Sequence, residues 1–304
     1  MVKVLKYSGL GLLGVLVLLI GFLFGAPMFF DASVLPKNYG QVDTRLYANG
    51  SANQPLLVFF GGSEGGNGMT LARRAAERQQ YLDAGYAMLA IGYFGLENTP
   101  ASLDRISLNA IYQEIEKARH APNINSRCVA VLGGSKGAEL ALTLASYFPT
   151  IKGAVAFAGS HIVYAGTSLY ANGEASSFMF NDKQVPFVPL PSKIIPSILM
   201  GDFRRAYEIT MEDHAAVEQA RIKVENIQGP ILLVSGEYDH VWPSKEMSDE
   251  VMKRLGEHEF SFAHEHIVVP EGNHFQPQKE YHSQAIEFLN THFLPTCGDH
   301  VARN

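Results

Sequence analysis

From residue 41 onward, short apolar runs alternate with longer segments in which apolar residues recur at helical spacing. The short runs predict strands at residues 41–47, 55–60, 86–93, 128–132, 152–158, 231–234 and 266–269. The longer segments predict helices at residues 71–83, 102–119, 214–226, 243–255 and 279–293, and one more that starts at residue 135. Ser102 is the expected N-cap of the second helix. This alternation favours an α/β fold with a mostly parallel sheet covered by helices on both faces.

One connection between these elements is much longer than the others. More than fifty residues separate the strand that ends near Ala158 from the helix that starts near His214, whereas such loops commonly have about 2–6 residues. We expect residues 161–213 to form a cap-like insertion whose aromatic side chains line an apolar acyl pocket. A surface excursion, or aromatics that form only a small core of the cap, are the alternatives. The aromatic residues are Tyr164, Tyr170, Phe178, Phe180 and Phe187.

The N-terminal stretch has a different pattern. Residues 7–30 contain no charged residue, and Lys3 and Lys6 precede them. This stretch exceeds the about 7–15 apolar residues of a signal peptide and is long enough to cross a bilayer. We therefore expect residues 1–30 to be a single membrane anchor, with a cleaved signal peptide as the alternative. The preceding lysines place the N-terminus in the cytoplasm. Residues 31–304 are then one extracytoplasmic domain, secreted if the segment is cleaved.

Composition narrows the classes of function. The net charge is −6 and only 18% of the residues are charged, so a nucleic-acid partner is not expected. Two cysteines, Cys128 and Cys297, are too few for a disulfide framework, and we expect buried free thiols, although one bridge between them stays open. No motif calls for a metal or a cofactor, and none indicates an oligomeric state.

The stretch from Cys128 to Ser146 combines an apolar run, a glycine-rich turn and an Ala- and Leu-rich helical segment. The turn is Gly133-Gly134-Ser135-Lys136-Gly137, a G-x-S-x-G pattern between a strand and a helix, as a nucleophile elbow requires. We expect the flanking glycines because any side chain there would collide with the neighbouring strand and helix. Ser135 is therefore the candidate nucleophile.

A second G-x-S-x-G pattern occurs at Gly61-Gly62-Ser63-Glu64-Gly65. Further glycines follow it, so it predicts a loop and not an immediate helix. This loop suits the other half of the machinery, because α/β-hydrolases take one oxyanion donor from the residue after the nucleophile and another from an early strand–helix loop. The expected backbone donors are Lys136 and either Gly62 or Ser63. The Lys136 ammonium is expected to point to solvent.

A serine hydroxyl needs a base within hydrogen-bond reach, and the base needs an acid to hold it. In this class of site the acid follows a later strand and the histidine follows the last one. Glu237 and Asp239 both follow the strand 231–234, and we choose Asp239 because it lies deeper in the loop. His274 follows the strand 266–269. The pattern predicts a triad of Ser135, Asp239 and His274.

Five segments carry a resemblance to a known family. The segments are residues 59–66 (FFGGSEGG), 93–97 (YFGLE), 133–140 (GGSKGAEL), 229–244 (GPILLVSGEYDHVWPS) and 269–275 (VPEGNHF). They are similar to the C-terminal catalytic domain of the acyl-CoA thioester hydrolase and bile acid-CoA:amino acid N-acyltransferase family, over roughly residues 50–293. The resemblance implies an α/β-hydrolase fold with Ser135 as nucleophile, Asp239 as acid and His274 as base.

The function expected from these features is hydrolysis of acyl thioesters or carboxylic esters through an acyl-enzyme. Family transferases that act on bile acids carry cysteine at the nucleophile position, so the resemblance implies hydrolysis where Ser135 stands. Two features of the chain depart from the family. Long members carry a β-sandwich domain ahead of the catalytic domain, whereas the predicted membrane anchor stands ahead of it here. Coenzyme A esters are cytoplasmic, whereas the predicted topology places this domain outside the cytoplasm. An acyltransferase that uses an amine or alcohol acceptor, and a membrane-tethered binding protein without activity, are the alternatives.

Overall fold

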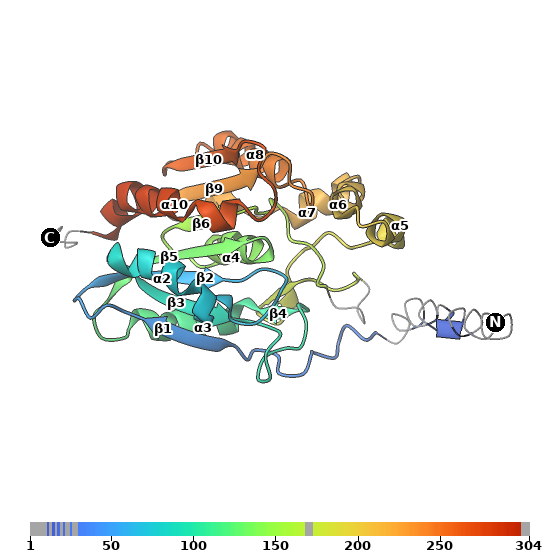
Figure 1. The fold of residues 1–304 in the computed structure, drawn as a ribbon, viewed down its shortest axis with the longest axis horizontal. Helices are drawn as coiled ribbons and strands as arrows, with labels where there is room; N and C mark the ends of the chain where they lie inside the picture. The colour runs from blue at the N-terminus through green and yellow to red at the C-terminus, as the bar shows by residue number, and fades with distance from the viewer. Residues whose placement is uncertain are drawn as a thin grey trace, which may run out of the picture.

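The computed structural model describes residues 30–167 and 173–298, together with single positions between residues 11 and 25. A seven-stranded sheet forms its centre, in the order β1-β3-β2-β5-β6-β9-β10 (Figure 1). β1 is antiparallel to β3, and all other neighbours are parallel. The strands are β1 (Asp43–Tyr47), β2 (Gln54–Phe60), β3 (Ala87–Gly92), β5 (Ile124–Gly134), β6 (Ala154–Phe157), β9 (Ile231–Gly236) and β10 (His264–Val269).

Helices cover both faces of this sheet, as the alternating pattern predicts. One core contains side chains from α3, α4 and α8, and the other contains side chains from α2 and α10. The helices are α2 (Ala75–Asp83), α3 (Leu108–Arg119), α4 (Lys136–Tyr147), α5 (Ile195–Leu199), α6 (Phe203–Thr210), α7 (His214–Ala220), α8 (Ser244–Glu257), α9 (Pro277–Glu280) and α10 (His282–Phe288). The expected mostly parallel α/β architecture is therefore confirmed.

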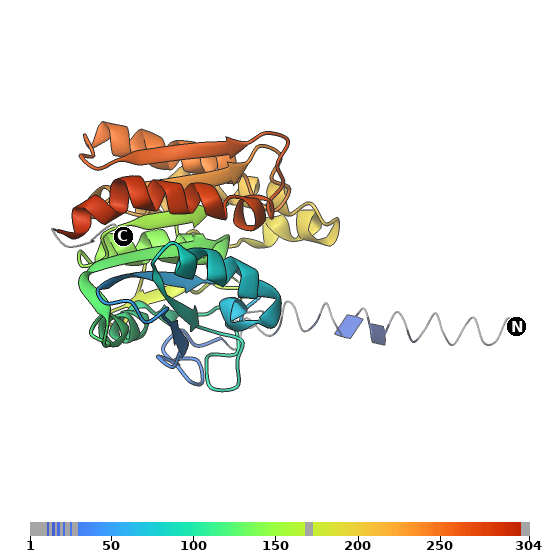
Figure 2. The same ribbon diagram turned by 60° about the vertical axis from the view of Figure 1, so that its left-hand side comes forward.

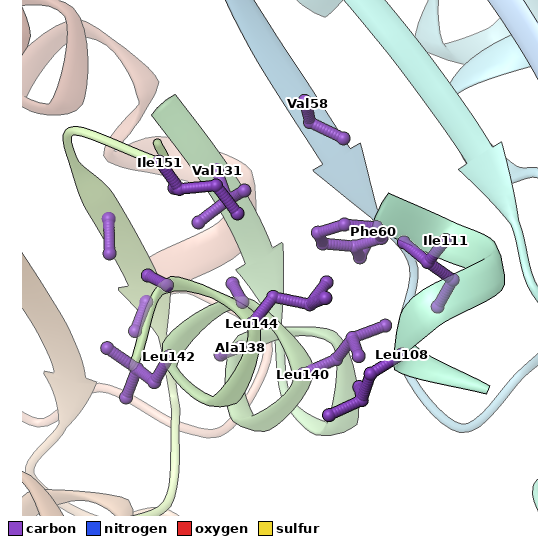
Figure 3. Packing of buried hydrophobic residues seen from close by; sticks show 14 of the residues in the cluster. Val58, Phe60, Leu108, Ile111, Val131, Ala138, Leu140, Leu142, Leu144 and Ile151 are labelled. Atoms are coloured by element: carbon purple, nitrogen blue, oxygen red, sulfur yellow. The ribbon is translucent and has the colours of Figure 1, made fainter. Parts of the chain in front are cut away.

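Strand β2 shows how a continuous apolar run builds two cores at once. All of its residues are buried, and successive side chains of a strand point to opposite faces. Val58 and Phe60 lie in the core with α3 and α4, whereas Leu57 and Phe59 lie in the core with α2 and α10. Figure 3 shows Phe60 packed between α3 and α4, beside side chains that include Leu108, Ile111, Leu140 and Leu144.

Several of the expected helices have different bounds, because α2 starts only at Ala75 and α7 ends at Ala220. The expected helix 102–119 starts only after Ser107, whose hydroxyl accepts a hydrogen bond from the amide of Ala110, so Ser102 is not its N-cap. Residues 106–107 instead form β4 (Ile106–Ser107), which pairs with β7 (Phe178–Phe180), and β7 pairs with β8 (Lys183–Gln184). The expected helix 279–293 divides into α9, α10 and a π turn at Leu289–Phe293.

The expectation of free thiols is wrong. Cys128 at the buried part of β5 and Cys297 at the end of the described chain form a disulfide, with Cα atoms 4.9 Å apart. The two positions are 169 residues apart, and the last helices return across the sheet to bring them together. Sequence spacing carried no signal for this pairing.

No helix in the described part of the chain is long and apolar enough to cross a membrane. Most of the expected anchor at residues 7–30 lies outside the described residues, so the anchor stays a prediction. Residues 30–34, which begin at the end of this stretch, are held against the domain by contacts with Arg105, which is 3% exposed. Its guanidinium donates hydrogen bonds to the carbonyls of Ala32 and Val34, each at 2.9 Å, and packs over the ring of Phe30.

Candidate active site

Ser135 stands at the corner between β5 and α4, with φ 55° and ψ −122°. This left-handed conformation is rare for a residue with a side chain and persists only where the surrounding structure enforces it. The turn is possible because the positions that flank it carry no side chains. A Cβ on Gly133 would collide with the carbonyl of Gly137, and a Cβ on Gly137 would collide with the carbonyls of Phe60 and Gly61. The predicted reason for the flanking glycines is confirmed.

The glycine-rich loop after β2 lies against this corner. A Cβ on Gly62 would lie 3.3 Å from the Cβ of Ser135 and 3.1 Å from the carbonyl oxygen of Gly134. The hydroxyl of Tyr93, which is fully buried, donates to the carbonyl of Gly61 at 2.7 Å and holds the loop in place. Of the two expected oxyanion donors in this loop, the structure brings Gly62 to Ser135, whereas the side chain of Ser63 is exposed.

The amide of Gly62 has a partner within its own loop. It donates a hydrogen bond to Oε1 of Glu64 at 3.0 Å, and Glu64 itself is exposed. The other carboxylate oxygen of Glu64 would lie 2.9 Å from a Cβ on Gly62, on the side that also faces Ser135. A carboxylate therefore occupies one of the two candidate oxyanion donors.

Asp239 and His274 form a buried pair between the loops after β9 and β10. Oδ2 of Asp239 lies 2.7 Å from Nδ1 of His274, and the residues are 1% and 2% exposed. The same oxygen accepts from the hydroxyl of Ser244 at 2.6 Å, while Oδ1 accepts from the amides of Val241 and Trp242. Burial opposes ionisation, but the hydrogen bonds from His274 and Ser244 outweigh it and hold the pKa of Asp239 below its usual range.

His274 is enclosed by aromatic rings and lies in the loop before α9, a helix that contacts the serine corner. Its ring centroid lies 5.9 Å from that of Trp242 and 5.2 Å from that of Phe275, both edge to face. Gln278, four residues further on, lies so close to Gly134 that a Cβ there would collide with its side-chain amide oxygen. Helix α9, which directly follows the loop with His274, is thus in contact with the corner that carries Ser135.

The other carboxylate and histidines near these loops bind other partners. Glu237 accepts a hydrogen bond from the amide of Glu271 at 2.9 Å. His266 lies in β10, with its ring nitrogens 2.7 Å from the Ser235 hydroxyl and 3.1 Å from the Asp249 carboxylate. His240 is exposed and contacts the ring of Phe275. The geometry therefore favours Asp239 over Glu237 as the partner of His274.

The prediction that the Lys136 ammonium points to solvent is wrong. Lys136 is 1% exposed, and its Nζ donates to Oε1 of the fully buried Glu139 at 2.7 Å. The rings of Tyr164 and Phe178 cover the ammonium, and the amide of Tyr164 donates to the same Glu139 oxygen. Burial lowers the pKa of the Lys136 ammonium and raises the pKa of the Glu139 carboxyl, against the attraction within the pair.

The long insertion packs onto the start of α4 through Tyr164 and Phe178. Phe178 belongs to the main core, and Phe180 and Phe187 pack against that core from its edge. Tyr170 lies outside the described residues. Phe178, Phe180 and Phe187 therefore extend the core of the domain and do not form a separate small core of the cap. The acyl pocket stays a prediction.

Three residues near the pair were not among the sequence candidates. Ser244 binds Asp239, and Trp242 packs on His274 and donates from Nε1 to the carbonyl of Ala158 at 2.9 Å. Arg204 of α6 donates from Nη1 to the carbonyl of Asp239 at 3.0 Å. Ser244 and Trp242 lie within five residues of Asp239 in the chain, which was a usable signal. Arg204 lies in the long insertion, and no local pattern marks it.

The fold and the arrangement of these loops define an α/β hydrolase. Solved structures with this architecture include a puromycin-hydrolysing peptidase from Mycobacterium tuberculosis (TM-score 0.57, 16% identity, 84% of this chain and 37% of that one). A putative α/β hydrolase from Agrobacterium tumefaciens matches with a TM-score of 0.51 and 14% identity, over 82% of this chain and 90% of that one. At such identities the likeness establishes the fold alone.

The chain belongs to the BAAT / acyl-CoA thioester hydrolase C-terminal family, whose model matches residues 113–278. Curated relatives include mitochondrial acyl-coenzyme A thioesterase 2 from Mus musculus, 27% identical over 57% of this chain and 36% of that protein. Acyl-coenzyme A thioesterase 3 from Mus musculus is 28% identical over 64% of this chain and 42% of that protein. The chain thus spans about two-fifths of the length of these relatives.

Proposed function

We propose that this protein is a serine hydrolase of acyl thioesters or carboxylic esters. The observation that carries the proposal is the buried Asp239–His274 pair beside the strained serine corner. A carboxylate that holds Nδ1 of an imidazole leaves Nε2 free to act as a base. The family, and relatives named as acyl-coenzyme A thioesterases, support an acyl thioester as substrate.

In the proposed reaction, Nε2 of His274 takes the proton from Oγ of Ser135 as this oxygen attacks the acyl carbonyl. Asp239 holds the ring and stabilises the imidazolium that forms. The negative charge on the carbonyl oxygen is bound by the amides of Lys136 and Gly62. The Lys136 amide is available because the first amides of a helix have no intrahelical acceptor. His274 then protonates the leaving group, and a water that it activates releases the acid.

Replacement of Ser135 by Ala tests this proposal. We expect the variant to lose nearly all turnover of nitrophenyl esters and acyl-coenzyme A substrates, and to lose labelling by a fluorophosphonate probe. Thermal unfolding of the variant serves as the control for folding. Full turnover by Ser135→Ala would remove Ser135 as the nucleophile. An amide or ester product that forms only with an added acceptor would identify an acyltransferase instead.

Attachment to a membrane is the second part of this proposal. The uncharged residues 7–30 tether residues 31–304, which include the cap-like insertion 161–213, to the extracytoplasmic side of a bilayer. The Cys128–Cys297 disulfide supports this side, because disulfides persist mainly in oxidising compartments. A topology reporter fused to the C-terminus tests the orientation. A reporter that is active only in the cytoplasm would exclude it and favour coenzyme A esters.

A further inference from the structure

Exposed apolar side chains concentrate at one edge of the sheet. Leu71 follows β2, Leu96 follows β3, Leu199 and Met200 lie in the insertion after β6, Tyr238 follows β9 and Phe275 follows β10. These six residues, here called the apolar rim, all belong to connections that leave the carboxyl ends of parallel strands. Such connections lie at the same edge of a sheet, which is also the edge that carries Ser135 and His274.

The rim is most exposed at the tip formed by α5 and α6. Leu199 and Met200 are 78% and 77% exposed, and Phe203 beside them is 44% exposed. In both Figure 1 and Figure 2, α5 and α6 project from the side of the molecule toward which β9 and β10 point. Side chains of this size rarely stay in water as a group unless the group binds a partner.

The basic groups next to this tip pair with carboxylates, and the exposed Asp202 accepts a hydrogen bond from the amide of Arg205 as the N-cap of α6. Lys193 lies 3.3 Å from a carboxylate oxygen of Glu212, and Arg205 pairs with Glu208 and Glu212. The tip therefore presents apolar side chains without a net basic patch. This combination suits the acyl region of a bilayer better than an acidic protein or a layer of anionic headgroups.

The point where the N-terminal stretch joins the domain indicates that the partner of the apolar rim is a membrane. Phe30 to Val34 are held by Arg105, which lies in the connection that leaves the carboxyl end of β3. The uncharged residues 7–29 therefore join the domain at the same edge as the apolar rim. Val34 and Leu35, just after this point, are 63% and 40% exposed. A membrane that holds residues 7–29 would face the rim.

From these observations we infer that the apolar rim is a bilayer-docking surface, with Leu199 and Met200 inserted among the lipids and the serine corner facing the membrane. The docking surface rests on the proposed tether and does not need the proposed chemistry. Together with the proposed hydrolysis, it assigns the substrate to a class, namely acyl esters or thioesters that reside in the bilayer and enter from it.

Fluorescence quenching in the full chain tests the docking. Because both native cysteines form the disulfide, Leu199→Cys supplies a single free thiol for an environment-sensitive dye. The matched control is Lys253→Cys, whose native side chain is 61% exposed in the second half of α8, away from the carboxyl edge. In phosphatidylcholine vesicles that contain doxyl-labelled lipid, we expect several-fold stronger quenching at position 199 than at position 253.

Different results would exclude the docking surface and the membrane tether. If the chain floats with the vesicles but positions 199 and 253 are quenched equally, the docking surface is excluded and the tether stands. If the chain does not float with vesicles, both are excluded. A dye signal at 199 that changes with protein concentration without lipid would point to a second copy as the occupant and overturn the inference. The same measurement in Ser135→Ala separates docking from catalysis, because docking does not need the nucleophile.

A double change, Leu199→Asp with Met200→Asp, provides the functional measurement. Both side chains are exposed, so the fold should tolerate the change. We expect turnover of a long-chain ester embedded in vesicles to fall about tenfold, because charge opposes insertion, while turnover of soluble nitrophenyl acetate stays unchanged. Equal turnover of the embedded ester by both proteins would contradict the inference.

Discussion

Arg204 donates a hydrogen bond from Nη1 to the carbonyl oxygen of Asp239 across 3.0 Å. This bond connects helix α6 of the long insertion to the loop after β9 that carries Asp239, here called the acid loop. Its other nitrogens bind Glu208 in α6 and Glu246 in α8, at 3.0 and 2.6 Å. The guanidinium therefore fixes three elements at once, and one of them carries the residue that orients His274.

Arg204 acts on the proposed reaction as a positioning residue. We expect Arg204→Met to lower kcat by roughly fivefold to thirtyfold, as the loss of about 1–2 kcal/mol of charge-assisted hydrogen bonding implies, with little change in KM. Arg205→Met, an exposed neighbour on the same helix, is the control. Steady-state kinetics on a soluble ester distinguish the two. If both variants lose the same activity, the bond to the acid loop has no special role.

Asp239 gives a prediction for pH dependence. Its pKa in the folded protein lies below the unfolded value of about 3.9. It therefore contributes stability at pH values above about 4, and this contribution is lost as the pH falls through the folded pKa. We expect Asp239→Asn to reduce the free energy of unfolding at pH 7, and this difference from the wild type to shrink as the pH falls below 4 toward the folded pKa of Asp239, as measured by urea denaturation.

The same variant should lose activity by a factor of about 10³–10⁴, because an amide in that place favours the wrong tautomer of the imidazole. Glu237→Gln is the matched control, since Glu237 binds a backbone amide and not His274. If both variants lost comparable activity, Asp239 could not be assigned as the acid in preference to Glu237.

Gly62 gives a prediction about the space beside Ser135, the proposed nucleophile. A methyl group at this position would lie 3.3 Å from the Cβ of Ser135 and 2.9 Å from the Glu64 carboxylate. We expect Gly62→Ala to lower kcat/KM by about 10²-fold or more, because it displaces a proposed oxyanion donor. In Gly68→Ala the new methyl would meet only one atom, at 4.0 Å, and activity should persist. Ester turnover of the two purified variants provides the comparison.

The amide of Gly62 donates to the carboxylate of Glu64. In the proposed reaction, a substrate must therefore displace this carboxylate before the amide can bind the oxyanion. We expect Glu64→Ala to raise kcat/KM by a few-fold, since the exposed carboxylate is held by little more than this bond. Glu97→Ala serves as a control on an exposed acid in a neighbouring loop. A fall in kcat/KM on Glu64→Ala would instead show that the carboxylate shapes the loop for catalysis.

The buried Lys136–Glu139 pair makes a prediction about stability. We expect Glu139→Ala to cost about 3–5 kcal/mol in the free energy of unfolding, because it leaves the Lys136 ammonium buried without a partner. The combined change Lys136→Met and Glu139→Leu should recover most of this loss. Chemical denaturation of the single and double variants measures both. Equal losses would mean that packing, and not the unpaired charge, dominates.

The sequence predicted the sheet and the loops that carry the candidate residues because that information is local. An apolar run identifies a buried strand, and the chain order of Ser135, Asp239 and His274 follows the order of the strands. The exclusion of side chains at Gly133 and Gly137 was likewise a local consequence of the sharp turn.

The rest depended on residues far apart in the chain. Lys136 is buried because Tyr164 and Phe178, from the long insertion, cover it, and a helical pattern around Ser135 alone could not show this. Ser102 and Ser107 are equally good caps by residue type. Pairing of Ile106 and Ser107 with β7 decided between them. The contact of Arg204 with Asp239 joins positions 35 residues apart, outside the reach of any periodicity.

The disulfide between Cys128 and Cys297 closes residues 128–297 into a covalent ring, and this ring contains Ser135, Asp239 and His274. A protease that cuts one exposed peptide bond inside the ring, for example in the α5–α6 tip, would open the ring without releasing a fragment. The nicked protein would remain one molecule until it met a reductant. The disulfide thereby keeps both sides of such a cut covalently joined at the very edge where the rim is most exposed.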